Sequence, residues 1–246
     1  MRKKIDFHVH LGSSEKARLF FDPAEYKRLA VSVGVEKAVA MPNISSRLSR
    51  GELNSHFLNS VFGDEFYFPF LLCGPGERSV IGHLAAKEIQ GLKFHPSLSQ
   101  VAVSSKEMFQ LWDGAQEYNP MVIVHCGRNE KSNIRYLVRA AIDFPGIRFV
   151  GAHLGGNATD LVDDALDYLS LMETLPQNLF LDTSAIKQPI LITRALDILG
   201  GTKILFGSDV PYADLKLSIN CVEYSREDKL MDNVFYGNAA RLLGIF

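Results

Sequence analysis

The sequence predicts an α/β protein built as a (β/α)8 TIM barrel, either regular or distorted. Eight apolar, strand-like segments alternate with helical segments along the chain, and such alternation favours parallel strands joined by right-handed crossovers. The strand segments are almost continuously apolar, which is typical of strands covered by helices. The length of 246 residues suits one barrel, so we expect residues 1–246 to form a single domain.

The expected strands are short runs rich in β-branched and aromatic residues. They span residues 4–10, 36–41, 66–72, 90–95, 121–125, 147–153, 179–183 and 203–208. The prediction of the third strand, 66–72, is the weakest because Pro69 cannot donate a hydrogen bond to a neighbouring strand. An open, doubly wound sheet is the alternative arrangement, but no glycine-rich dinucleotide motif follows the first strand, which disfavours it.

The expected helices lie between these strands and after the last one. They span residues 23–33, 51–63, 78–88, 105–118, 130–143, 160–174, 188–199, 213–231 and 233–243. Ser104 or Ser105 can cap the fourth helix, Pro189 suits the first turn of the seventh, and Gly244 ends the last. The loops that carry specificity in a barrel are then 11–22, 42–50, 96–104, 126–130, 154–159 and 210–214.

The composition disfavours several classes of partner. A net charge of −2 gives no electrostatic reason to expect a nucleic acid or an anionic membrane. No apolar run approaches the roughly 18 residues of a membrane span, and the N-terminus has no signal-peptide pattern. Cys73, Cys126 and Cys221 are too widely spaced for a disulfide framework or a metal-binding pair. We therefore expect a cytoplasmic protein that acts on a small molecule, and a homo-oligomer is compatible with this composition.

Histidines and aspartates gather at the predicted strand ends. His8 and His10 close the first strand, and residues two apart on a strand point to the same face. The other strand ends carry Lys93, His95, His125, His153, Asp182 and Asp209. Because barrel active sites lie at the carboxyl ends of the strands, we expect these side chains to meet there. Imidazoles combined with a carboxylate are typical ligands of zinc or a similar divalent ion.

Several short motifs together resemble a known family. They are FHVH, GLKFHP, VIVHCG, GAHLGG, LDTS, FGSDVPY and VFYGNAARLLGI. In this order they resemble the amidohydrolase superfamily, and most closely its amidohydrolase-related branch of metal-dependent hydrolases and relatives of aminocarboxymuconate-semialdehyde decarboxylase. The resemblance runs from His8 to about Leu243, and it implies a distorted (β/α)8 barrel with a divalent metal.

The resemblance implies a metal-binding role for four residues. His8 and His10 match the ligands on the first strand, and His125 matches the ligand on the fifth. Asp209 matches the carboxylate on the eighth strand. That carboxylate binds the metal in this branch, and elsewhere in the superfamily it also takes the proton from the attacking water.

The number of metals depends on two further residues. His153 matches a histidine that assists catalysis in members with one metal and binds the second metal in members with two. Members with two metals bridge them with a carboxylated lysine or a glutamate on the fourth strand, where only Lys93 could match the lysine. Alternation places Lys93 and His95 on one face but does not say which. We expect a single divalent metal, zinc or else manganese, with His153 and Asp209 as the catalytic residues.

Three residues are candidates for substrate binding: Arg128, His95 and Lys93. Arg128 could bind a substrate carboxylate through two parallel hydrogen bonds, although a solvated loop arginine explains it equally well. His95 precedes Pro96, which favours an extended backbone, and a structural role is just as compatible. The loops offer further candidate contacts in Ser45, Ser46, Arg47 and Tyr212.

Three functions are compatible with this pattern. The first is a hydrolase in which a metal-activated water attacks an ester, lactone or amide, with Asp209 and His153 moving the protons. The alternative is a metal-dependent, non-oxidative decarboxylase of a small carboxylic acid that uses the same ligands. The third, a non-catalytic metal- or ligand-binding barrel, is disfavoured because the whole ligand set is present. The pattern separates the first two poorly because one metal site serves both.

Overall fold

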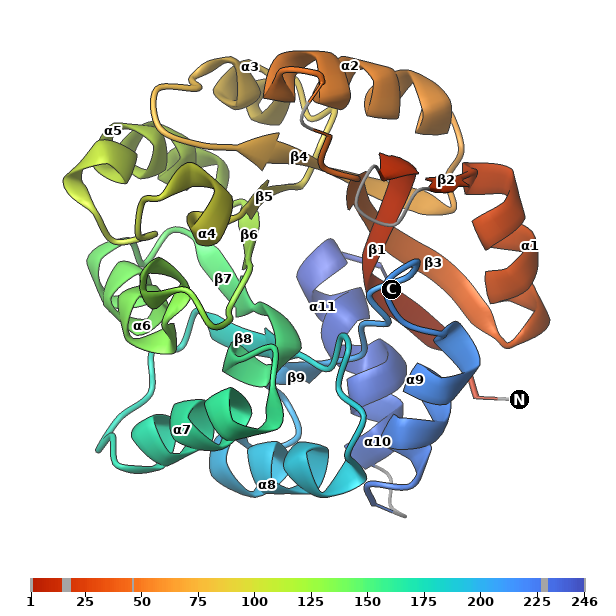
Figure 1. Ribbon diagram of the computed structural model, residues 1–246, viewed down its shortest axis with the longest axis vertical. Helices are drawn as coiled ribbons and strands as arrows, with labels where there is room; N and C mark the ends of the chain where they lie inside the picture. The colour runs from red at the N-terminus through yellow and green to blue at the C-terminus, as the bar shows by residue number, and fades with distance from the viewer. Residues whose placement is uncertain (1, 15–18, 46, 227–229, 246) are drawn as a thin grey trace.

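The computed structural model describes residues 2–14, 19–45, 47–226 and 230–245. Its strands are β1 Lys4–Ser14, β2 Leu19–Phe21, β3 Val35–Pro42, β4 Tyr67–Cys73, β5 Gly91–Phe94, β6 Met121–Val124, β7 Arg148–Gly151, β8 Leu179–Asp182 and β9 Ile204–Leu205. They form one sheet in the order β2-β1-β3-β4-β5-β6-β7-β8-β9. The described pairs from β1 to β9 are parallel, and the sheet curls around a central axis (Figure 1).

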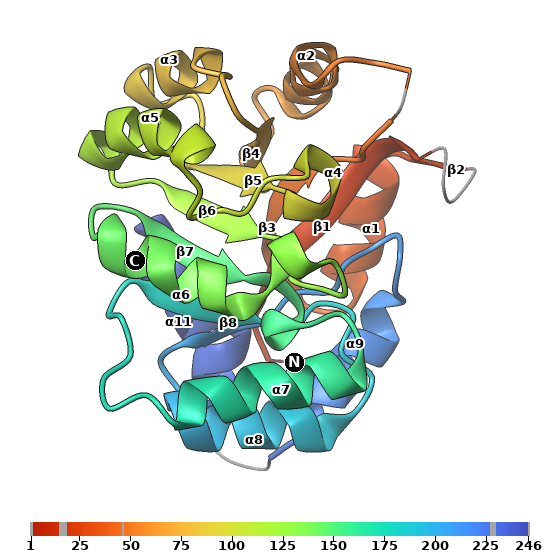
Figure 2. The ribbon, with the colours of Figure 1, turned by 60° about the vertical axis from the view of Figure 1, so that its left-hand side comes forward.

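Helices surround this sheet and confirm the predicted (β/α)8 class. They are α1 Pro23–Ser32, α2 Arg50–Val61, α3 Ser79–Ala85, α4 Pro96–Ser99, α5 Lys106–Ala115, α6 Ile134–Asp143, α7 Thr159–Ser170, α8 Pro189–Leu199, α9 Leu215–Glu223, α10 Leu230–Asp232 and α11 Asn238–Leu243, with short turns η1 Gln116–Tyr118, η2 Glu130–Ser132, η3 Ala152–Gly155 and η4 Asn233–Gly237. Neighbours such as α7 and α8 lie side by side in the outer layer (Figure 2). None of the described helices is both long enough and apolar enough to cross a lipid bilayer.

Local sequence explains where several helices begin and end. Asp22 accepts a hydrogen bond from Glu25 at the start of α1, and Ser49 with Glu52 forms a capping box on α2, so both helix starts have their first N–H groups satisfied. Ser105 is the residue before α5, as expected, but its side chain makes no capping hydrogen bond. Gly244 adopts a left-handed conformation after α11 and ends the chain's last helix.

The structure differs from the predicted elements in several places, among them the expected strand 147–153, which ends at Gly151, and the expected helix 130–143, which begins as the short turn η2. β1 continues to Ser14 and pairs antiparallel with β2, within a segment expected to be a loop. α4 is an additional short helix in the expected loop 96–104. The expected helix 213–231 is divided into α9 and α10, and residues 227–229 lie outside the described part of the chain. β9 is shorter than 203–208 because the residues after Leu205 leave β8 and bond to β1 instead.

Backbone hydrogen bonds between β1 and the segment that follows β9 close the ring. The N–H of Asp209 donates to the carbonyl of His8 at 2.9 Å, and the N–H of His10 donates to the carbonyl of Val210 at 2.8 Å. β1 therefore pairs with the segment after the last strand at the histidines themselves. As a result, the closure of the fold brings Asp209 beside His8 and His10.

An apolar core fills the barrel below these residues. Ile5 and Phe7 of β1 pack with inward-facing residues of other strands and with Ala239 and Leu243 of α11. These strand residues precede the histidines and Asp209 along the chain, so α11 covers the amino-terminal end of the barrel. The polar strand ends consequently lie at the opposite, carboxyl end, where barrel active sites are found.

Candidate metal centre

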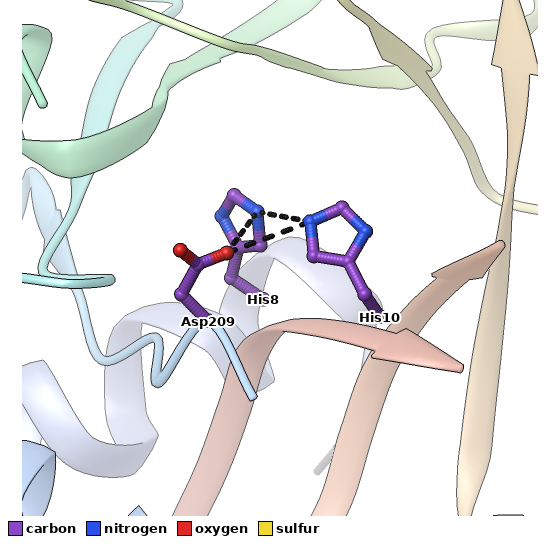
Figure 3. Close-up of side chains that lie close together, drawn as sticks. All are labelled: His8, His10 and Asp209. Atoms are coloured by element: carbon purple, nitrogen blue, oxygen red, sulfur yellow. Dashed lines mark hydrogen bonds and ion pairs between the residues drawn. The ribbon is translucent and has the colours of Figure 1, made fainter. Parts of the chain in front are cut away.

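Three buried side chains converge at the carboxyl end of the barrel. The Nε2 atoms of His8 and His10 lie 3.2 Å apart, and Asp209 Oδ1 lies 3.5 Å from each of them (Figure 3). Ligands bound tetrahedrally to zinc by bonds of about 2.0–2.1 Å lie about 3.3 Å from one another. The three atoms are therefore spaced as they would be around one divalent cation, and within the described residues they form a group that could hold a metal.

A bulge in β1 turns His8 toward this group. The pairing of β1 with β3 shifts register between Asp6 and Val9. Phe7 faces the barrel core and packs against Phe70, yet the next residue, His8, also faces the interior. Two successive side chains can share a face only where the strand bulges. The bulge thus lets one strand supply both a core residue and a metal ligand at adjacent positions.

Glycine at position 207 allows the closing segment to approach β1 at this point. A Cβ atom on Gly207 would lie 2.9 Å from the Cβ of His8, a separation that real Cβ contacts essentially never show. Any other side chain there would push Asp209 away from His8. The glycine is therefore required by the close packing of the two segments that carry the ligands.

The carboxylate of Asp182 orients His8. Nδ1 of His8 donates to Asp182 Oδ2 at 2.8 Å, so Nε2 carries the lone pair that faces His10, Asp209 and Lys93. Burial raises the pKa of Asp182, but His8, His153 and the hydrogen bonds outweigh it and hold the pKa below its usual range. A carboxylate that fixes the tautomer of a ligating histidine is a common supporting feature of metal sites.

Replacing Asp182 by asparagine is expected to weaken metal binding by about 10- to 100-fold, the usual effect of removing such a supporting partner. An amide can present N–H to Nδ1 of His8 and so favour the wrong tautomer. Competition with a chelating dye measures the affinity. Asp163→Asn is the matched control, since it removes a half-exposed carboxylate that pairs with Arg194 on the outer helices. Wild-type affinity in Asp182→Asn would reduce Asp182 to a packing role.

Asp182 and Ser184 also hold His153. The backbone N–H of His153 donates to Asp182 Oδ1 at 3.1 Å, and its Nδ1 lies 3.0 Å from the carbonyl and 2.8 Å from the hydroxyl of Ser184. His153 adopts a left-handed backbone conformation, with φ of 59°, which turns it sharply at the end of β7. With Nδ1 engaged as a donor, Nε2 is the atom that can accept or release a proton.

His125 contacts His153 and lies beyond it from the group of His8, His10 and Asp209. Its Nδ1 is 3.3 Å from His153 Nε2, and its ring stacks on His95 with centroids 4.0 Å apart. The ligand group of His8, His10 and Asp209 does not include it, so its assignment as the fourth ligand stays a prediction. Burial lowers the pKa of His10, His125 and His153, and the neutral imidazole is the form that binds metal.

Lys93 and His95 both face the barrel interior, which alternation alone left open. Lys93 is buried, and its Nζ lies 3.1 Å from Nε2 of His8. Burial lowers the pKa of Lys93 to about 8, although Asp182 and Asp209 oppose the shift. The amine therefore lies against the candidate metal ligands themselves. Its predicted role in substrate binding is untested by this geometry.

A family model provides the decisive comparison. The model described as Amidohydrolase matches residues 66–245, well over half of the chain. The chain belongs to the amidohydrolase family. It is therefore an enzyme, and the non-catalytic barrel is no longer an alternative. The matched region of this amidohydrolase includes His125, His153 and Asp209, whereas His8 and His10 precede it. No curated protein matches the sequence significantly.

Solved structures resemble this amidohydrolase over essentially its whole length. The 5-carboxyvanillate decarboxylase of Sphingomonas paucimobilis has a TM-score of 0.76 at 13% identity, with 100% of both chains covered. The dihydroxybenzoic acid decarboxylase of Polaromonas sp. JS666, with bound manganese and 2-nitroresorcinol, has a TM-score of 0.79 at 13% identity and coverage of 100% and 98%. A probable 2-pyrone-4,6-dicarboxylic acid hydrolase of Acinetobacter baumannii has a TM-score of 0.75 at 17% identity and coverage of 98% and 99%. At these identities the likeness establishes the fold alone.

The loop residues of this amidohydrolase that were predicted to contact substrate differ from one another in their surroundings. Arg128 is exposed, with 71% of its side chain accessible, and it lies 3.5 Å from Asp160; its role in substrate binding stays a prediction. Tyr212 lies beside the site, because its ring edge packs on His10 at 5.5 Å and its hydroxyl donates to Asn43. Ser46 lies outside the described residues.

Sequence reasoning missed two side chains that belong to this arrangement. Ser184 contacts both His8 and His153 through its hydroxyl, but the sequence marks it only as the last residue of the LDTS motif, two positions after the strand-end Asp182. Asp6 is fully buried and accepts a hydrogen bond from the backbone N–H of His8. An acidic residue two positions before His8 on a buried strand was the signal that could have found it.

Proposed function

We propose that this enzyme is a divalent-metal-dependent, non-oxidative decarboxylase of a small carboxylic acid. The observation that carries the proposal is the buried group of His8, His10 and Asp209, with His153 held close by. The two decarboxylases named above support decarboxylation because they share the fold over the whole chain, and one of them binds manganese. This reverses the order of the two enzymatic functions expected from the sequence.

In this proposal His8, His10 and Asp209 hold one metal ion, and His125 is the fourth ligand. When bound, a divalent metal supplies positive charge that stabilises negative charge developing on a substrate oxygen. The histidine-rich ligand set favours zinc, whereas the manganese bound in the Polaromonas enzyme favours manganese. A single metal leaves His153 free to act on the substrate. The substrate is a small molecule processed in the cytoplasm.

His153 is the proposed proton carrier. Decarboxylation breaks the bond between the carboxyl carbon and the substrate, and the electron pair stays on the substrate carbon, which must then gain a proton. Nδ1 of His153 is held by Ser184, so the proton is carried on Nε2. Burial lowers the pKa of His153, which makes its protonated form a stronger acid toward that carbon.

Hydrolysis is the second candidate, and the likeness to a probable pyrone hydrolase favours it. The same residues would serve, with Asp209 and His153 taking the proton from water. The difference between the two reactions lies in the bond that breaks. The fate of solvent atoms therefore separates them.

Assays in isotopically labelled water test the proposal. Zinc- or manganese-loaded protein is incubated with hydroxybenzoates and unsaturated carboxylic acids, and separately with pyrones, other lactones, esters and amides. We expect release of carbon dioxide and, in D2O, one deuterium on the carbon that lost it. Incorporation of 18O from water into the product without release of carbon dioxide would instead establish a hydrolase. Metal-stripped protein, and the same protein after metal is restored, provide the controls.

A further inference from the structure

Asp6 is a buried carboxylate on β1 that the proposed chemistry does not use. Its side chain is completely buried. Oδ2 accepts a hydrogen bond from the hydroxyl of Tyr26 on α1 at 2.8 Å. Oδ1 accepts two hydrogen bonds from backbone N–H groups, those of Ser208 at 2.9 Å and His8 at 3.2 Å. Both carboxylate oxygens are therefore fully engaged.

The two backbone donors belong to the two segments that carry the candidate metal ligands. His8 lies at the bulge of β1 and is itself a ligand. Ser208 directly precedes Asp209 and lies 202 positions from Asp6 along the chain. One carboxylate oxygen thus ties β1 to the segment that follows β9, at the point where their ligands meet.

We propose that Asp6 is a positioning residue for the metal centre, and that its carboxylate sets the separation of His8 from Asp209. The inference rests on the proposed function, because it takes these residues to be metal ligands. A strand bulge leaves backbone N–H groups without a partner on the neighbouring strand, and buried N–H groups need an acceptor. Asp6 supplies that acceptor on the side of β1 away from the metal.

A requirement of packing alone would not account for this choice of side chain. Asp6 is completely buried, and taking a carboxylate out of water is costly unless its oxygens accept hydrogen bonds. An apolar side chain would fill the same space without this penalty. Only a hydrogen-bond acceptor can hold the N–H groups of His8 and Ser208 together. A charged acceptor binds them about twice as strongly as a neutral one.

Titration of the metal-free protein with Co2+ tests the role of Asp6. The ligand-field absorption of Co2+ reports both affinity and geometry, independently of any activity. Asp6→Ala is expected to raise the Kd for Co2+ by about 10- to 100-fold, in the range seen when partners of metal ligands are removed, and to change the absorption spectrum. Asp6→Asn keeps a neutral acceptor, so a smaller increase of about three- to tenfold is expected.

Asn54→Ala is the matched control. Asn54 is also a buried polar side chain that bonds to backbone, since it exchanges two hydrogen bonds with Leu72 on β4. It lies on α2, away from the ligands. Its replacement is expected to lower the unfolding temperature while leaving the Co2+ affinity and spectrum unchanged.

The outcomes separate the two proposals. If the wild-type protein binds no Co2+, the proposed metal site is wrong. If the wild-type protein binds Co2+ but folded Asp6→Ala has the same Kd and spectrum, the role of Asp6 is overturned, whatever its effect on stability. Should Asp6→Ala fail to fold, Asp6→Asn decides the question in the same way, and an unchanged Kd overturns the role.

Discussion

The His10→Ala variant is expected to bind divalent metal about 100- to 1000-fold more weakly than the wild-type protein. Structural zinc sites with four ligands contribute about 10–16 kcal/mol of binding free energy, so each ligand contributes about 2.5–4 kcal/mol. His10 Nε2 lies 3.2 Å from His8 Nε2 and 3.5 Å from Asp209 Oδ1. Alanine removes one of the three ligands of this group.

Metal content after dialysis and direct titration with Zn2+ or Mn2+ measure this effect. His83→Ala is the control, because it removes a half-buried histidine on α3 that pairs with Glu88. The control is expected to retain one metal per chain with unchanged affinity. A His10→Ala protein with the metal content and affinity of the wild type would remove the basis of both enzymatic functions.

The His153→Gln variant is expected to lose about 10²- to 10⁴-fold in kcat, the usual contribution of a general acid or base, while keeping its metal. Glutamine can fill much of the space and can still bond to Ser184, but it cannot carry a proton at the position of Nε2. Because the proposal places His153 outside the ligand set, the metal affinity and the stoichiometry of one per chain are expected to stay unchanged.

Metal analysis gives this second prediction its sharpest test. If the wild-type protein holds two metals and His153→Gln holds one, His153 is a ligand, and the single-metal proposal is wrong. A variant with full activity would instead assign His153 a structural role at the end of β7. His56→Gln, which alters an exposed histidine on α2, controls for the substitution itself.

The order of strands and helices could be predicted because its signals are local. Apolar runs such as 121–125 and first-turn residues such as Pro189 act within a few positions, and the parallel arrangement follows from the alternation of strands and helices. β4 formed despite Pro69, which pairs in register with Ala40. Boundaries were less predictable. Residues 206–210 left the last strand for β1, and such long-range pairing leaves no periodic trace in the sequence.

Some features of the candidate site could likewise be predicted from the sequence, and others could not. Strand-end positions alone marked His8, His10 and Asp209 as residues that should meet, and the structure brings these three together. The same reasoning could not orient Lys93, since alternation defines a shared face without saying which face is inside. It also could not locate Ser184 or Asp6, because their partners lie on other strands.

The sequence by itself determined the type of chemistry, namely a barrel whose strand ends carry imidazoles and a carboxylate suited to a divalent metal. Only the tertiary structure decided how those groups are aimed. The bulge in β1 moves His8 inward beside Phe7, and a one-residue change of register reverses which face a side chain occupies. That bulge is held by Asp6 through a segment 202 residues away. Residue type and period are local properties of a chain, whereas the separation of ligand atoms depends on which distant segments pair.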